Sequence, residues 1–448
     1  KFILRRSLFF RTFMEGKKNT VSLTPKKILI ITYYWPPSGG SGVQRWMYFA
    51  KHLRLLGWEP VVITVDERQA SFPTLDPSLL KEVEGIRVIK TQTREPLRWY
   101  SRLVSGNNRG GIPQGEVKTK SLFEKIAAYI RGNYFIPDAR KGWIPFALKA
   151  AKKLLKEESF SYLITTGPPH STHLVGLALK DTYPISWWAD FRDPWADLFY
   201  NTSLYRTQKS IAKDQALEKL VLQKADGILT TLGGRLHDQL KAIAPKQTFT
   251  ALPNGYDADL MASVKGMPPK GIFHVVFTGL LTHNQEYDSV IKAIAKFQEQ
   301  HTIQLSLAGQ ISTEIYTEIK KALPHVKVIN RGYLSHKEAV QLMKNAHLLL
   351  NFIFKGAQTQ MISGKLLEYM ATGVPLLSIG DPDSEAGKFI SQGSETKMIA
   401  VDNHKGIIEF IRRVANQKET LQNEFPNLDQ WSRGGLTKRL VKDVLLKK

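Results

Sequence analysis

Short runs of apolar and β-branched residues alternate with amphipathic stretches along most of this chain. Such runs are typical of strands buried on both faces, and the helical periodicity between them predicts helices that cover those faces. In the first half the pattern predicts strands at 26–34, 59–65, 86–92, 161–167, 185–191, 226–232 and 248–254. In the second half it predicts strands at 273–279, 303–309, 326–332, 347–353, 374–380 and 396–402.

The two series of strands predict an α/β protein with two doubly wound, Rossmann-like parallel sheets. The break between them is expected at 259–271, where two prolines and two glycines precede the second series. We therefore predict a first domain over 1–258 and a second over 259–430. A basic helical tail, about 431–448, is expected to pack back on the first domain, and the polar stretch 105–120 to form a long surface loop.

The composition fits a globular chain, since 42% of the 448 residues are hydrophobic and 23% are charged. The absence of cysteine excludes disulfides and thiolate metal sites and fits a reducing compartment. No apolar run reaches the roughly 18 residues that a bilayer crossing requires. The basic start lacks the small-residue cleavage site of a secretory signal, so it is not interpreted as one.

The net charge of +23 is distributed unevenly along the chain. Residues 1–150 contain 26 lysines and arginines against 11 aspartates and glutamates, a balance of +15, whereas 251–400 contain 14 against 13. A basic first half predicts an anionic partner, such as a membrane surface or nucleic acid, or a solvated surface with no binding role. No zinc-ligand spacing, RNP-like aromatic motif or basic zipper supports nucleic acid, so that partner is not expected.

The segment YYWPPSGGSGVQRW, at 33–46, directly follows the first predicted strand. Pro36 and Pro37 end the strand. Small residues then let backbone amides approach a ligand: Gly39, Gly40, Ser41 and Gly42. A helix with its apolar face at Val43, Trp46, Met47, Ala50 and Leu53 is expected next, ending near Gly57. Because bare amides at a helix N-terminus attract anions, the segment predicts a phosphate-side loop, the alternative being a turn that binds nothing.

A second junction of this kind lies at 358–380, QTQMISGKLLEYMATGVPLLSIG. The pattern predicts a polar loop, a helix over about 362–372 and a buried strand. Ser363 and Gly364 stand at the helix start, where free amides can receive a phosphate, and Lys365 adds a cation. One turn later Glu368 offers a carboxylate that can accept both hydroxyl protons of a ribose diol. The alternative is an ordinary surface lysine and glutamate on an amphipathic helix.

Two polar clusters follow strands of the first half, at the sheet edge where ligands bind in doubly wound folds. In TTGPPHSTH, His170 stands at the strand end as a ligand-contacting or a structural residue, and His173 adds only half of a metal site. In ADFRDPW, Asp190 is nearest the strand end and is the candidate to accept a proton from a hydroxyl. Arg192 is expected to order both carboxylates, and Asp193 to turn the chain. Neither cluster predicts a bound metal.

The stretch ILIITYYWPPSGGSGVQRWMYFAKHLRLLGWEPVVIT resembles the opening of bacterial GT-B glycosyltransferases, especially family 4. The resemblance continues through NYFIPDARKGWIPFALKAAKKLL, ITTGPPHSTHLVGLALK and WWADFRDPW, which look like the first domain of a polysaccharide-assembly branch. LPNGYD, GYLSHKEAVQLMKNAHLLLNF and SGKLLEYMATGVPLL resemble the entry to the second domain and its donor-binding part. The resemblance implies two domains facing a cleft, with the glycine loop over the donor diphosphate and transferring sugar and His170 near the sugar or the acceptor.

Two departures from the family pattern concern the donor site. Family 4 members usually carry two glutamates separated by seven residues, and here Glu368 matches the second whereas Gln360 replaces the first. The family often has an arginine and a lysine after the first strand of the second domain, where this chain has Leu280 and Gln285. We expect Lys365 or Arg331 to supply the missing positive charge, because charge developing on a leaving diphosphate must be stabilised.

The resemblance implies a retaining glycosyltransferase. Because Asp190 and Asp193 do not form a DxD motif and no other metal-ligand candidate appears, we expect it to be metal-independent and without a cofactor, with helix dipoles and Lys/Arg in place of a cation. It would move a sugar from a nucleoside-diphosphate sugar, held by the second domain, to a glycan or lipid-linked acceptor in bacterial surface polysaccharide assembly. The expected location is the cytoplasm, with the basic first half on an anionic inner-membrane surface. Two alternatives stay open: a non-catalytic glycan-assembly binding protein, favoured by Leu280 and Gln285, and a nucleotide-sugar epimerase, which Gln360 disfavours.

Overall fold

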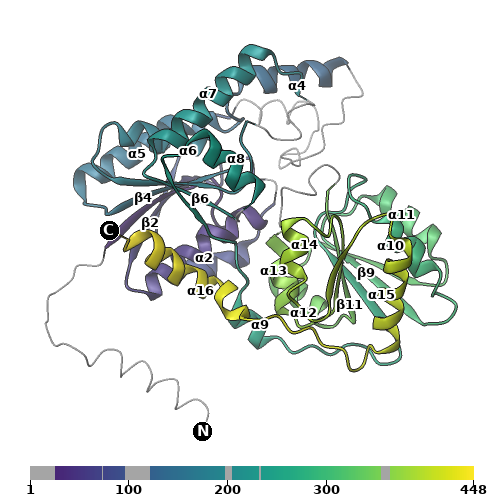
Figure 1. Cartoon of the computed structure of the whole chain (residues 1–448). Coiled ribbons are helices and arrows are strands. Elements are labelled where there is room, and N and C mark those ends of the chain that lie inside the picture. The colour runs from purple at the N-terminus through teal and green to yellow at the C-terminus, as the bar shows by residue number, and fades with distance from the viewer. Residues whose placement is uncertain are drawn as a thin grey trace, which may run out of the picture.

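The computed structural model describes residues 26–72, 74–95, 122–196, 204–231, 234–354 and 364–447. Figure 1 shows two α/β bodies, the first from the N-terminal half and the second from the C-terminal half. The predicted loop at 105–120 and the basic start lie outside the described residues. Among the described helices, none combines the length and the hydropathy that crossing a bilayer requires.

In the described part of the first half, seven strands form one parallel sheet in the order β3-β2-β1-β4-β5-β6-β7. The strands are β1 (Lys27–Ile31), β2 (Glu59–Val65), β3 (Arg87–Thr91), β4 (Tyr162–Gly167), β5 (Ser186–Phe191), β6 (Gly227–Thr230) and β7 (Thr248–Ala251). Each coincides with a strand predicted from the apolar pattern. The helices are α2 (Ser41–Leu55), α4 (Leu122–Tyr134), α5 (Ile144–Glu157), α6 (Ser171–Lys180), α7 (Gln208–Lys224) and α8 (Arg235–Ile243).

The described residues of the second half form a six-stranded parallel sheet in the order β10-β9-β8-β11-β12-β13. The strands are β8 (Phe273–Thr278), β9 (Ile303–Ala308), β10 (Lys327–Gly332), β11 (Leu348–Phe352), β12 (Leu376–Ile379) and β13 (Thr396–Ile399). The helices are α10 (Asp288–Ala295), α11 (Thr313–Ala322), α12 (His336–Lys344), α13 (Gly364–Ala371), α14 (Glu385–Ile390) and α15 (His404–Asn416). The predicted fold class, two doubly wound parallel sheets, is therefore confirmed.

Apolar side chains cover both faces of each sheet, as near-continuous apolar strands require. In each sheet the strand order reverses direction at one point, between β1 and β4 in the first and between β8 and β11 in the second. Ligands of doubly wound sheets bind beyond the carboxyl ends of the strands at such a reversal. The loops that follow β1, β4, β8 and β11 are therefore the places to look for a site.

The C-terminal tail crosses back to the first body, as Figure 1 shows for α16 (Arg433–Leu440) beside α2. Tyr256, on the segment that joins the two sheets, pairs with Ser432 in an isolated β-bridge. Leu436 and Leu440 of α16 are buried in the same apolar cluster as Met47 of α2. Burying a leucine side chain stabilises a fold by about 1.5–3 kcal/mol, so this contact fixes the crossing. The domain boundary at 258/259 itself stays a prediction.

Candidate active site

The glycine segment after β1 forms a bare helix N-terminus. Gly40 is the residue before α2 and has φ of 89°, a backbone conformation that glycine adopts without strain. The Gly39 amide donates to the Thr74 carbonyl at 2.9 Å, so it is not available to a ligand in this conformation. Within the described residues, no acceptor is found for the amides of Gly40 and Gly42. Two of the four predicted positions therefore present free donors at the start of α2.

A buried ion pair lies directly beneath this helix start. Arg45 and Asp190 have side chains that are 1% and 0% exposed, and Arg45 Nη2 donates to Asp190 Oδ1 at 2.7 Å. Trp46 Nε1 and Thr166 Oγ1 both donate to Asp190 Oδ2, at 2.7 and 2.8 Å. Both carboxylate oxygens are thus occupied and shielded from water. This geometry favours a positioning role for Asp190 over the predicted transfer of a proton.

Arg192 does not order the two carboxylates, so that expectation is wrong. Its guanidinium instead donates to the backbone carbonyls of Gly167, Pro168 and Gly42, which joins the loop after β4 to the glycine segment. The carboxylate left over is Asp193, which is partly exposed and has no hydrogen bond or ion pair within the described residues. Burial raises the pKa of the Asp193 carboxyl and Arg192 opposes that shift, so this group is suited to contact a polar ligand.

His170 packs as an aromatic residue at the start of α6. Its ring is 3% exposed, stacks on Trp195 with centroids 5.2 Å apart, and lies 3.1 Å through Nε2 from the Pro194 carbonyl. Burial, with His173 close by, holds the pKa of His170 well below its ordinary value, so the ring is neutral at pH 7. Its Nδ1 is buried and lacks a partner among the described residues. These contacts favour the structural interpretation of His170.

In the second domain, Lys365 places a cation at the carboxyl end of β8. It is the second residue of α13. Its Nζ donates to the Thr278 carbonyl at 3.0 Å and lies 4.2 Å from the centroid of the Phe277 ring. No carboxylate pairs with it within the described residues, and burial lowers the pKa of its ammonium from 10.5 to about 7. A mostly buried cation without a counter-ion is an incomplete site that an anion would complete.

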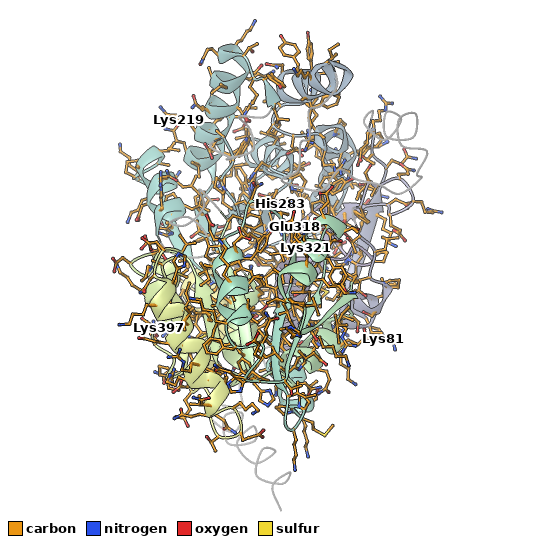
Figure 2. All side chains as sticks on the ribbon, turned by 90° about the vertical axis from the view of Figure 1, so that its right-hand side faces the viewer. Lys81, Lys219, His283, Glu318, Lys321 and Lys397 are labelled. Atoms are coloured by element: carbon orange, nitrogen blue, oxygen red, sulfur yellow. The ribbon has the colours of Figure 1, made fainter. Side chains whose placement is uncertain are left out.

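The loop after β8, residues 279–287, contains no lysine or arginine. Gln285 is 3% exposed and ties the loop together, since its side chain accepts from the Thr282 amide and donates to the Phe352 carbonyl. Its neighbour His283 contacts the Tyr287 hydroxyl, which donates weakly to Glu318, and Figure 2 shows His283 and Glu318 close together. Gln285 is thus a structural residue, and among the described residues Lys365 is the cation that contacts this strand end.

Glu368 and Arg433 bring the two helix starts together. Arg433 Nη2 donates to Gln44 Oε1 at 2.7 Å and to Glu368 Oε1 at 3.2 Å. Gln44 lies in the first turn of α2 and Glu368 in the second turn of α13. The same nitrogen therefore contacts both helices, so their N-terminal turns face each other across one guanidinium. The two predicted junctions are on opposite sides of one interdomain gap.

A histidine also holds Glu368. His336, the first residue of α12, donates through Nε2 to Glu368 Oε1 at 2.8 Å. Burial alone raises the pKa of the Glu368 carboxyl, but His336 and Arg433 outweigh burial and hold that pKa below its ordinary value. Glu368 is therefore ionised at neutral pH, as a ligand for sugar hydroxyls should be.

Of the remaining predicted residues, Arg331 lies apart from this cluster. Arg331 is exposed on the edge strand β10, and among the described residues no contact joins it to Lys365 or Glu368. Gln360 and Ser363 lie outside the described residues, and Gly364 begins α13 as expected. Within the described residues no group of three or more histidines and carboxylates is arranged to hold a metal ion.

Sequence reasoning missed three residues that shape the site: Arg45, His336 and Arg433. Arg45 lies within the glycine segment, but its partner Asp190 is 145 residues away. Arg433 lies in the tail that was predicted to return to the first domain, and it contacts Glu368 across 65 residues. No local pattern marks such pairs. The one available signal was a charged residue amid the apolar positions of an otherwise buried helix.

Taken together, bare amides and a lone lysine lie at the helix starts of two Rossmann-like domains, and Arg433 joins those helices through an ionised glutamate. This arrangement can hold a diphosphate at the helix starts and a diol at the carboxylate. Two such domains with their ligand-binding edges facing each other define the GT-B class of fold. Residues 272–417, most of the second domain, match the model of the Glycosyl transferases group 1 family.

Solved structures of this class resemble the chain over nearly its whole length. Sucrose-phosphate synthase from Thermosynechococcus elongatus is 14% identical, with 94% of each chain covered and a TM-score of 0.58. HepE from Anabaena, solved with UDP-glucose, is 12% identical, with 94% of this chain and 99% of that chain covered and a TM-score of 0.56. The lipopolysaccharide outer core galactosyltransferase WaaB is 14% identical, with the same coverage and a TM-score of 0.54. No curated protein matches the chain.

The buried ion pair predicts a large stability effect at Asp190. Asp190→Asn keeps the shape of the side chain but leaves the Arg45 charge buried and unpaired, which should lower the free energy of unfolding by about 3–5 kcal/mol. Asp193→Asn, at a carboxylate with no hydrogen bond or ion pair within the described residues, should change it by less than about 1 kcal/mol. Urea unfolding followed by circular dichroism measures both. Equal effects would show that Asp190 is not the structural carboxylate.

Removing the Lys365 charge should raise the free energy of unfolding, the opposite of the effect expected for Asp190→Asn. Because its pKa falls from 10.5 in the unfolded chain to about 7 in the fold, its charge destabilises the ligand-free protein. Lys365→Met should therefore raise the urea midpoint at pH 7. Between pH 7 and 10.5 the unfolded chain binds a proton that folded Lys365 has released, so wild-type stability should rise with pH relative to the variant.

The matched control for this measurement is Lys388→Met, at an exposed position of α14. It should leave the urea midpoint and its pH dependence as in the wild type. A lower midpoint for Lys365→Met would mean that Lys365 has a stabilising structural partner and is not a cation that lacks a ligand.

Proposed function

We propose that this protein is a glycosyltransferase that takes its sugar from a nucleoside-diphosphate donor bound at the interdomain gap. The observation that carries the proposal is the single guanidinium of Arg433, which contacts the first turn of α2 and the second turn of α13. Two helix N-termini on opposite sides of one gap concentrate positive potential where a diphosphate would lie. The group 1 family match and the UDP-glucose in the HepE structure support this donor class.

The donor would contact the second domain first. Its ribose hydroxyls would bind Glu368, and its diphosphate would lie at the amides that begin α13, beside the Lys365 ammonium. A bound diphosphate would raise the pKa of Lys365 and keep it charged, so the cation could stabilise the charge that develops on the leaving group. In this proposal no metal ion is required. Retention of the anomeric configuration follows from the family resemblance alone.

The acceptor would approach from the first domain, where Asp193 is the available carboxylate. It lies on the loop after β5, next to Arg192, which holds the glycine segment through the Gly42 carbonyl. A carboxylate with a raised pKa can receive the proton that an acceptor hydroxyl loses as the glycosidic bond forms. Asp193 thus takes over the role first assigned to Asp190. We propose a glycan or lipid-linked acceptor in bacterial surface polysaccharide assembly.

A binding-only protein is the second candidate function. Gln285 is committed to holding its loop and Leu280 carries no charge, so two cations common in the family are absent from the described loop. Lys365 alone could bind a nucleotide without stabilising a leaving group well enough for turnover. An epimerase of the same fold would need further carboxylates around the sugar.

We further propose that α4 attaches the first domain to an anionic inner-membrane surface on the cytoplasmic side. Four large side chains lie on one face of this helix and remain 42–66% exposed: Ile126, Tyr129, Ile130 and Tyr134. Figure 1 shows α4 beside α7 at the periphery of the first domain. Lys141 donates to the Tyr134 carbonyl, and Lys213 of α7 is near enough to help burial lower the Lys141 pKa. An apolar face beside basic residues suits an anionic bilayer.

The proposed donor site predicts nucleotide release from a panel of UDP-, GDP- and dTDP-sugars. At least one donor should be hydrolysed slowly alone and faster with an acceptor. Glu368→Ala should weaken binding of that donor by about 1–3 kcal/mol, because a charge-assisted contact is lost. Asp193→Asn should lower kcat by about 100-fold or more with donor affinity unchanged. Binding of a donor with no turnover under any condition would favour the binding-only protein.

The proposed membrane contact predicts salt-dependent binding to vesicles that contain phosphatidylglycerol. Ile126→Ser together with Ile130→Ser should reduce sedimentation with these vesicles about tenfold, because each exposed apolar side chain contributes to insertion. Leu80→Ser together with Met267→Ser, at exposed apolar positions elsewhere, is the matched control. Wild-type binding that is absent at low salt, or equal loss in both double variants, would exclude α4 as the attachment surface.

A further inference from the structure

Arg433 makes more contacts across the gap than its place in a C-terminal tail requires. Its side chain is 5% exposed, and besides Gln44 and Glu368 it contacts Asp257 Oδ2 at 3.4 Å. Its guanidinium carbon lies 3.6 Å from the centroid of the Tyr48 ring. Gln44 and Tyr48 belong to α2, Asp257 to the joining segment and Glu368 to α13. One buried cation therefore links both domains and the segment that connects them.

We infer that Arg433 is a positioning residue that orients Glu368 for the nucleoside and couples this contact to the closed arrangement of the two domains. The inference rests on the proposed function, since it takes Glu368 to be the carboxylate that binds the donor. It goes further by making the tail helix α16 part of the donor site, although Arg433 itself reaches that site only through Glu368.

The two oxygens of Glu368 are treated differently. Oε1 receives hydrogen bonds from both Arg433 Nη2 and His336 Nε2, whereas Oε2 has no partner within the described residues. Two donors on one oxygen fix the rotation of the carboxylate, because a planar group held at one oxygen keeps the other in place. Oε2 therefore cannot rotate to accept a hydrogen bond from a neighbouring residue and stays available to a ligand hydroxyl. A preoriented acceptor loses less conformational entropy when a hydroxyl binds.

The coupling follows from sharing one nitrogen between the domains. If the gap opens, Nη2 keeps either Gln44 or Glu368 but not both, because the two oxygens belong to different domains. An opened gap with Arg433 kept on α2 leaves Glu368 with His336 as its one described donor. Closure of the gap should therefore raise the affinity of Glu368 for the donor. By linkage, donor binding should shift the equilibrium toward the closed arrangement by the same factor.

The test compares variants at Arg433 with Arg439→Met, which removes a second, more exposed arginine from the same helix. Titration calorimetry with UDP, GDP and dTDP first identifies the nucleotide that the wild-type protein binds. Arg433→Met should weaken its binding about 10- to 100-fold. Arg433→Lys should restore part of the affinity, because an ammonium reaches one partner but not two. Arg439→Met should stay within about twofold of the wild type.

A second arm examines the coupling itself. Gln44→Met should weaken nucleotide binding less than Arg433→Met, and the double variant should be no worse than Arg433→Met alone, because both changes break the same link. Small-angle scattering of the ligand-free protein should show a larger radius of gyration for Arg433→Met than for Arg439→Met. Gln44→Met and Arg433→Lys keep the test valid should Arg433→Met fold poorly.

The outcomes separate this inference from the proposed function. If the wild-type protein binds none of the three nucleotides, the proposed donor site is wrong and the coupling with it. If it binds one and Arg433→Met binds it equally well, only the inference is overturned, and Arg433 merely anchors α16. Additive effects of Gln44→Met and Arg433→Met would likewise exclude the shared link.

Discussion

The buried ion pair between Arg45 and Asp190 is the contact on which the first half of the site depends. A charge pair this deep is expensive to desolvate, and it persists because every donor and acceptor around it is used. Besides Asp190, the Arg45 guanidinium binds three acceptors where the chain leaves β7 for the second domain: the carbonyls of Leu252 and Pro253 and the Asn254 side chain. The start of α2, the end of β5 and the exit toward the second domain are therefore fixed by one guanidinium. Moving any of them would leave a charge buried without its partner.

Arg433 plays the corresponding part between the domains, but with a different balance of charge. Arg45 has one carboxylate and several neutral acceptors, whereas Arg433 lies near two carboxylates, Glu368 and Asp257, and also contacts a neutral amide. Asp257 keeps the Arg433 cation paired when Gln44 and the first domain move away, while Oε2 of Glu368 has no partner among the described residues and is open to a ligand. In the core pair both oxygens of Asp190 are occupied, so that pair leaves no oxygen for a ligand.

The fold could be predicted well because each strand of a parallel sheet that is covered on both faces is encoded by a short, continuous apolar run. Each of the strands in the described residues lies where such a run was found, and the helix before Gly373 was predicted within two residues at either end. The same locality gave the two glycine or serine junctions and Lys365. It failed where a residue's contacts depend on a distant partner: nothing near Asp190 in the sequence shows that Arg45 will occupy its carboxylate. Arg433 was missed for the same reason, although the return of its helix was foreseen.

In the proposed donor site, one lysine provides positive charge where family 4 members often have two further cations, which would change how a donor binds. An arginine stays charged whatever its surroundings, so a pair of fixed cations imposes its full repulsion and desolvation on the empty site. Lys365 can instead shed its proton when no anion is present, because burial brings its pKa to about 7. The empty site then contains less uncompensated positive charge, and Lys365 becomes protonated again when a diphosphate binds. The consequence is that binding takes up a proton, which ties occupancy of this site to pH in the neutral range. In this site Gln285 holds the loop after β8 and Lys365 supplies the charge, so the structural role and the electrostatic role belong to different residues.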